Sequence, residues 1–120
     1  MRTGRWIALL ALALAVAGSD GFAAADRYGA IAAASDGRYG YSFDHVSRGA
    51  AEAFALSKCG HGGCVVKVWF KNNCGAYARG RNGEGWAYAE TRAAAQRRAL
   101  AECAAQTRSC AILCWACNGQ

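Results

Sequence analysis

An internal duplication is the feature that most constrains the fold of this chain. Segment 47–59 matches segment 91–103 without a gap, and each begins with Ser or Thr followed by Arg and ends in Cys. Upstream, residues 29–32 match 75–78. Downstream, the run 64–69 matches 110–115. Because these matches occur in the same order, they predict that one folding unit is present twice.

Each copy has the residue pattern of two strands, a helix and a third strand. Asp36-Gly37 and Asn82-Gly83 are turn signals between paired strands. Ser47 and Thr91 are natural helix N-caps, and small residues then recur at every fourth position, which lets a helix lie close on a sheet. We therefore predict an α+β fold in which two β-β-α-β repeats form one sheet of about six strands, with two helices on one face.

The first 25 residues are predicted to be a signal peptide. Arg2 and Arg5 precede an uncharged apolar run over 6–17, and the alanines of 23–25 provide a cleavage site. A helix of this run would span about 18 Å of a hydrocarbon core of about 30 Å, so it does not read as a membrane anchor. We expect cleavage after Ala25 and export to the periplasm or the medium. A single duplicated domain then covers 26–120, with repeats over about 28–74 and about 75–118.

Seven cysteines in so short an exported chain predict a disulfide-stapled domain. Equivalent cysteines of the two repeats should form equivalent bonds, which predicts Cys59–Cys64 and Cys103–Cys110. Cys114 takes the place of Val68 in the first repeat and is predicted to be a buried free thiol. The remaining pair is Cys74–Cys117, which would tie the end of the first repeat to the end of the second.

Two sets of residues favour an enzyme as the alternative interpretation. Cys114 and Cys117 form a C-x-x-C motif, which is typical of thiol oxidoreductases when it lies at a helix N-terminus, but too few residues follow Cys117 to form a helix. His45, next to Asp44, is a candidate general base for a hydrolase, although no nucleophile accompanies it. We predict no catalytic residue, cofactor or metal site, and treat these two enzymes as the alternative function.

A basic and aromatic surface is the more suggestive feature. The mature chain carries a net charge of +5, because removal of the leader takes away two of the 14 basic and one of the 8 acidic residues. Rings and cations alternate on neighbouring strands, and an uncovered sheet face would expose them together. This predicts a non-enzymatic binding or protein-interaction module, with an inhibitor or immunity-type protein as one form of it. The predicted binding residues are Lys67, Trp69, Lys71, Tyr41 and Trp86.

The partner expected from this surface is another envelope or secreted protein, or an anionic glycan. Nucleic acid is not expected as a partner, because the chain is predicted to be exported.

Several motifs resemble a secreted bacterial family catalogued as domain of unknown function 4189. They are the Tyr28-Gly29-Ala30 start, the two helices that end at Cys59 and Cys103, and the run from Val66 to Ala76. The resemblance extends over essentially the whole mature chain. It implies an exported, cysteine-bridged domain and supplies no catalytic residue. This chain departs from the family pattern at Cys114, where a plain apolar residue is expected.

Overall fold

The computed structural model describes residues 25–119 of the 120-residue chain. The first half contains β1 (Tyr28–Ala33), β2 (Tyr39–His45), α2 (Arg48–Cys59) and β3 (Val65–Lys71). The second half contains β4 (Cys74–Arg79), β5 (Glu84–Ala89), α3 (Arg92–Gln106) and β6 (Ala111–Cys117). Both halves thus have the predicted order β-β-α-β.

The predicted signal peptide lies, except for Ala25, outside the described residues. Within residues 25–119, no helix is both long enough and apolar enough to cross a bilayer.

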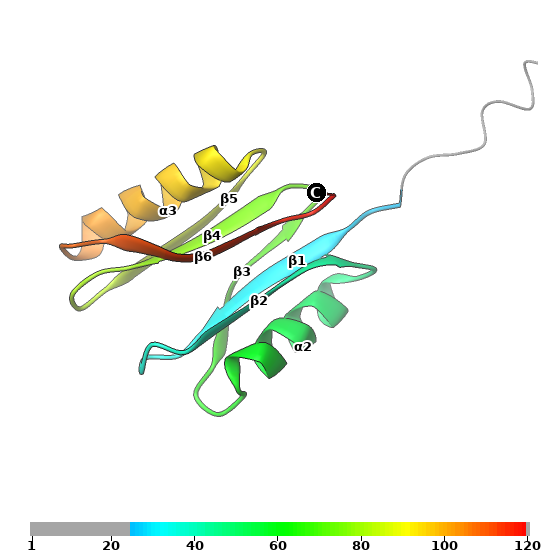
Figure 1. Cartoon of the computed structure of the whole chain (residues 1–120), viewed down its shortest axis with the longest axis horizontal. Helices are drawn as coiled ribbons and strands as arrows, with labels where there is room; N and C mark the ends of the chain where they lie inside the picture. The colour runs from blue at the N-terminus through cyan, green and yellow to red at the C-terminus, as the bar shows by residue number, and fades with distance from the viewer. Residues whose placement is uncertain (1–24, 120) are drawn as a thin grey trace, which may run out of the picture.

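The six strands form two three-stranded antiparallel sheets, where the sequence led us to expect one. β1 is the central strand of the first sheet, in the order β2-β1-β3, and β4 is the central strand of the second, in the order β5-β4-β6. The sheets pack face to face with one helix on each outer face, so the layers run α2, first sheet, second sheet, α3 (Figure 1). The α+β class and the repeated unit are as predicted. The single sheet, with both helices on one face, is corrected.

The central strands explain this arrangement, because both of their faces are buried. On β1, Ala30 packs against α2 while Ile31 packs into the cluster between the sheets. On β4, Ala76 packs against α3 while Tyr77 packs into that same cluster. Successive side chains of a strand point to opposite faces. One sheet with both helices on one face would leave Ile31 and Tyr77 in water, whereas a second sheet buries them.

One aromatic ring fills the space where the two repeats meet. Phe70 is 1 % exposed, and its ring lies against Gly29 of its own sheet and Gly75 of the other, so a Cβ at either glycine would overlap it. Gly29 and Gly75 are equivalent residues of the two repeats, but the equivalent of Phe70 is Ala116. The two repeats therefore differ where they meet. The close-packed space between them holds one aromatic ring, which the first repeat supplies, and the second repeat has an alanine at that position.

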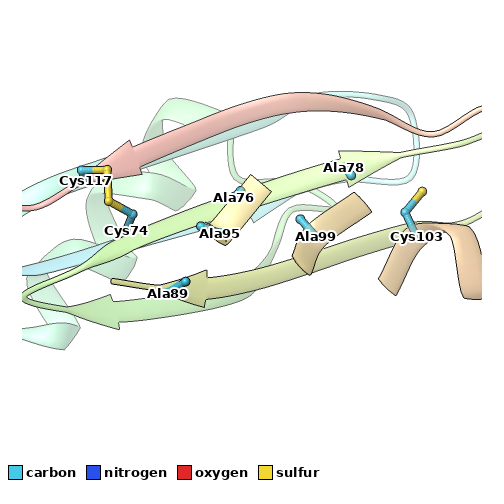
Figure 2. Close-up of a cluster of buried hydrophobic side chains, with 8 residues drawn as sticks. All are labelled: Cys74, Ala76, Ala78, Ala89, Ala95, Ala99, Cys103 and Cys117. Carbon is cyan, nitrogen blue, oxygen red and sulfur yellow. A yellow bond between two sulfur atoms is a disulfide. The ribbon is translucent and has the colours of Figure 1, made fainter. Parts of the chain in front are cut away.

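Each helix begins at its predicted N-cap and lies close on its sheet. The Ser47 hydroxyl accepts a hydrogen bond from the Ala50 N–H at 3.1 Å, and the Thr91 hydroxyl accepts one from the Ala94 N–H at 3.1 Å. Strand β5, which faces α3, has Gly85 at the point of closest contact, where a Cβ would lie 2.8 Å from the Cα of Cys103. The buried stripe of α2 is Ala51, Ala55 and Cys59. The buried stripe of α3 is Ala95, Ala99 and Cys103 (Figure 2).

Two of the three disulfides link each helix to the strand that follows it, and the third joins β4 to β6 in the second sheet. They are the pairs that the duplication predicts: Cys59–Cys64, Cys103–Cys110 and Cys74–Cys117. Figure 2 shows Cys74 and Cys117 joining β4 to β6. Cys114 is a free thiol and is buried. Three disulfides in a domain of this size are typical of an oxidising compartment.

Candidate functional site

The duplication gives the molecule two equivalent grooves between the sheets. The β3–β5 groove has a volume of about 710 Å³, and the β2–β6 groove has a volume of about 410 Å³. Because β2 and β3 flank β1, the two grooves lie at opposite edges of the first sheet. The β3–β5 groove is lined by residues that include Lys67, Trp69, Trp86, Tyr88 and Arg98. The β2–β6 groove is lined by residues that include Tyr39, Tyr41, Phe43, Leu113 and Trp115.

The structure brings together three of the five predicted binding residues. Lys67, Trp69 and Trp86 line the β3–β5 groove. Lys71 lies at the end of β3, where its ammonium is 3.3 Å from the Asp26 carboxylate and 5.8 Å from the centre of the Tyr28 ring. Tyr41 lines the β2–β6 groove at the opposite edge. The role of these five residues in binding stays a prediction.

A polar network at the edge of the β3–β5 groove joins the two sheets. Lys67 Nζ of β3 donates a hydrogen bond to Glu84 Oε2 of β5 at 2.8 Å, and the Tyr77 hydroxyl donates to the other oxygen of Glu84. Arg79 Nη1 donates to the Tyr77 hydroxyl at 3.2 Å. Leu113 of β6 is equivalent to Lys67 in the aligned repeats. Tyr39 is equivalent to Glu84 by strand register, because it pairs with Ala33 of β1 as Glu84 pairs with Arg79 of β4. The same groove is therefore charged in one copy and apolar in the other.

The network shifts the pKa of both of its acids. Burial raises the pKa of Tyr77, and the neighbouring Glu84 carboxylate raises it further. For Glu84, burial raises the pKa, but the hydrogen bonds from Lys67 and Tyr77 outweigh that effect and hold it below its usual value. Glu84 is thus an ionised acceptor near neutral pH, and Tyr77 a neutral donor.

Cations also lie over the rings of the groove. The guanidinium of Arg48 lies 4.4 Å from the centre of the Trp69 ring, and Lys67 Nζ lies 5.5 Å from that of Trp86. In the second repeat, Arg92 lies 3.8 Å from the centre of the Trp115 ring, at the positions equivalent to Arg48 and Trp69. The pairing of the helix arginine with the strand tryptophan is therefore part of the repeated unit.

Tyr88 and Arg98 are the aromatic and basic residues of the groove that are absent from the predicted binding set. Tyr88 is 57 % exposed on β5, and Arg98 reaches from α3 to donate a hydrogen bond to the Tyr88 carbonyl at 3.3 Å. Tyr88 lies two residues from Trp86 and therefore on the same face of β5, so strand alternation in the sequence could have predicted it as a further binding residue. No pattern in the sequence places Arg98 at the groove, because its position there depends on how α3 packs across the sheet.

The structure uses the cysteines of the candidate thiol oxidoreductase in another way. Cys117 is bonded to Cys74, so it does not form a redox pair with Cys114. Burial raises the pKa of the Cys114 thiol to about 12, which keeps it protonated near neutral pH. A redox-active cysteine needs the opposite environment, with an exposed and readily ionised thiol.

His45 lies beside an aromatic ring, and its role as a general base stays a prediction. Its ring lies 5.0 Å from that of Phe54, measured between centres, in an aromatic contact. The neighbouring Asp44 carboxylate accepts a hydrogen bond from the Gly119 N–H at 2.7 Å and lies 3.6 Å from the Arg27 guanidinium. The contacts of the Asp44 carboxylate are therefore with Arg27 and Gly119 and not with the imidazole. Within residues 25–119, no group of three or more His, Cys, Asp or Glu side chains could hold a metal ion.

Comparisons with known proteins agree with this architecture. The family described as Domain of unknown function (DUF4189) matches residues 28–117, the whole of the duplicated fold. Protein Rv1269c of Mycobacterium tuberculosis and Protein Mb1300c of Mycobacterium bovis are each 40 % identical over 95 residues, which cover 79 % of this chain and 73 % of either relative. The NMR structure of Rv1813c from Mycobacterium tuberculosis superposes with a TM-score of 0.60 at 33 % identity, covering 86 % of this chain and 84 % of that one. This chain belongs to the DUF4189 family.

Proposed function

We propose that the chain is an exported, non-enzymatic module that binds another exported protein through the β3–β5 groove. The observation that carries the proposal is the lining of this groove by Trp69, Trp86 and Tyr88, all three exposed, beside Arg98. Trp, Tyr and Arg are the residues that contribute most of the binding energy at protein interfaces. Their concentration around one open groove supports a site for another protein.

The balance of charge favours a protein over an anionic glycan. Lys67 is paired with Glu84, and Lys71 with Asp26. Arg98 shares its wall of the groove with the carboxylate of Glu102. A polyanion is held mainly by cations without acidic neighbours, whereas mixed and mutually paired charges suit the polar rim of a protein interface. The aromatic faces are then left as the main contact surface.

The proposed location rests on the disulfides and the predicted leader. Three bonds form and persist where the surroundings are oxidising, which in bacteria means outside the cytoplasm. The predicted signal peptide supplies the route. We infer that the domain acts in the periplasm or the medium.

The test is photo-crosslinking of the full chain, expressed with its own leader in its native host. A photoreactive amino acid replaces Tyr88 in the groove, and a control chain carries it at Ala53, which is exposed on α2. We expect a crosslinked protein partner from position 88 only. Adding Trp86→Ala should weaken that crosslink, because loss of a central aromatic side chain costs about 2 kcal/mol, or roughly 30-fold in Kd.

Two outcomes would contradict the proposal. In one, positions 88 and 53 give the same crosslinked species, or Trp86→Ala leaves the crosslink unchanged while the variant keeps its melting temperature. In the other, the purified chain binds a sulfated polysaccharide resin in a manner that depends on Trp86, which would replace the protein partner with an anionic glycan.

A further inference from the structure

Asparagine is followed by glycine at two places in the domain, and the fold gives the two different surroundings. Asn82-Gly83 lies in the turn between β4 and β5, and Asn118-Gly119 follows β6. This dipeptide can deamidate without an enzyme, because glycine has no side chain to keep its backbone nitrogen away from the amide carbon of the asparagine. In a folded chain the reaction depends on the nucleophilic glycine nitrogen, the amide carbonyl and the NH₂ leaving group.

At Asn118 all of these groups are engaged, and the residue is only 9 % exposed. The Gly119 N–H donates a hydrogen bond to Asp44 Oδ1 at 2.7 Å, which holds the nucleophile away from the amide. Asn118 Oδ1 accepts a hydrogen bond from the Asp44 N–H at 2.8 Å, and Asn118 Nδ2 donates one to the Phe70 carbonyl at 3.3 Å. Reaction at Asn118 therefore requires local opening of the fold.

At Asn82 the nucleophile and the leaving group are open. Asn82 is exposed, and among residues 25–119 neither its Nδ2 nor the Gly83 N–H donates a hydrogen bond. The Thr107 hydroxyl donates to Asn82 Oδ1 at 2.7 Å. A donor at this oxygen stabilises the negative charge that develops on it when the amide carbon is attacked. The contact with Thr107 thus favours the reaction and leaves both of the other groups accessible.

We propose that Asn82 is a modification site, which deamidates spontaneously in the folded chain while Asn118 is protected. The Gly83 nitrogen gives its proton to solvent and forms a bond to Asn82 Cγ. The bond between Cγ and Nδ2 breaks, and Nδ2 leaves as ammonia with a proton from water. Water then opens the resulting succinimide ring, which gives aspartate or isoaspartate at position 82. The net reaction consumes one water and converts an amide to a carboxylate and ammonium, without an oxidant or a reductant.

The modification adds a negative charge next to the β3–β5 groove. Asn82 lines a hollow of about 500 Å³ that is also lined by Glu84, Trp86 and Glu102. Trp86 and Glu102 line the β3–β5 groove as well, so the hollow adjoins it. A carboxylate at position 82 would join those of Glu84 and Glu102 and make this end of the groove more acidic. The inference does not depend on the proposed binding of another protein, because the reaction needs only the chain itself and water.

The test is peptide mapping by mass spectrometry of the purified chain, incubated at neutral pH with its disulfides intact. A reduced and denatured sample is incubated in parallel, until it has deamidated at both positions. In the folded chain we expect aspartate and isoaspartate at position 82, and reaction at position 118 that is at least about tenfold slower because it waits for local opening. Equal reaction at the two positions of the folded chain, or an intact Asn82 at that time, would overturn the proposal.

Cation-exchange chromatography of matched variants gives the second measurement. The wild type should accumulate a more acidic species with time, and freshly purified Asn82→Asp should elute with its aspartate form. Asn82→Gln should not accumulate this species, because glutamine would have to close a larger ring. Accumulation in Asn82→Gln at the rate of the wild type would assign the reaction to another amide and overturn the proposal. If Asn82→Gln does not fold, peptide mapping of the wild type still decides, because it needs no substitution.

Discussion

Substitution of Gly85 by alanine tests the close contact between helix and sheet on which each repeat depends. Gly85 of β5 lies beneath the buried stripe of α3, and a Cβ there would lie 2.8 Å from the Cα of Cys103 and closer still to backbone atoms of Ala99 and Cys103. Ordinary carbon contacts are about 3.5–4.0 Å. Relief of the overlap requires the helix to move by roughly 1 Å, and the Cys103–Cys110 bond ties down its end.

The expected loss of stability follows from this geometry. Overpacking a close-packed core typically costs about 1–3 kcal/mol. The upper end applies here, because backbone atoms cannot rotate away as a flexible side chain can. For a domain of about 60–100 residues, 1 kcal/mol shifts the melting temperature by about 4–8 °C, so Gly85→Ala should lower it by roughly 10–25 °C.

The assay is thermal unfolding followed by circular dichroism, with the disulfides kept oxidised. Gly49→Ala is the matched control, since Gly49 lies on α2 and a Cβ there would meet no atom within 4 Å. Alanine in a helix is favoured over glycine by up to about 1 kcal/mol, so the control should melt a few degrees higher than the wild type. Equal melting temperatures for Gly85→Ala and the wild type would refute the close approach of α3 to β5.

Three further predictions concern the core and the polar network. The Cys114 thiol should resist alkylation in the folded chain and react once denatured without reductant, as intact mass will show; labelling of the folded chain would contradict its burial. Phe70→Ala should cost about 4 kcal/mol in chemical denaturation, since it empties the space between the sheets, and a loss below about 1 kcal/mol would argue against their face-to-face packing. Glu84→Gln should cost about 2 kcal/mol at about pH 7. Because folding lowers the pKa of Glu84, the carboxylate stabilises the fold fully above its ordinary pKa, and this stabilisation is lost as the pH falls through the folded pKa. The difference in stability between the wild type and Glu84→Gln should therefore shrink as the pH is lowered toward about 3. A difference that stays constant with pH would contradict the ion pair with Lys67.

The residues alone were sufficient to predict the elements and the disulfides, because both depend on short spacings that occur twice. A turn signal at Asp36-Gly37 and an N-cap at Ser47 act over a few residues, and the same pattern in the second copy confirms their meaning. Equivalent positions of two copies form equivalent bonds, which predicted Cys59–Cys64 and Cys103–Cys110, and the place of Cys114 at a valine position left Cys74 to pair with Cys117. The grouping of Lys67 and Trp69 with Trp86 also followed partly from strand alternation.

Only the tertiary structure decided how the two repeats meet. Strand alternation in the sequence says which residues share a face of β1 or β4, but it does not say what covers the face of Ile31 and Tyr77, which only a facing sheet buries. The choice depends on contacts between residues far apart in the chain, such as the Phe70 ring against Gly75 and the Lys67 ammonium on Glu84. These contacts place Tyr41 and Trp69 at opposite edges of the first sheet, because the strand that carries each of them flanks β1 on a different side.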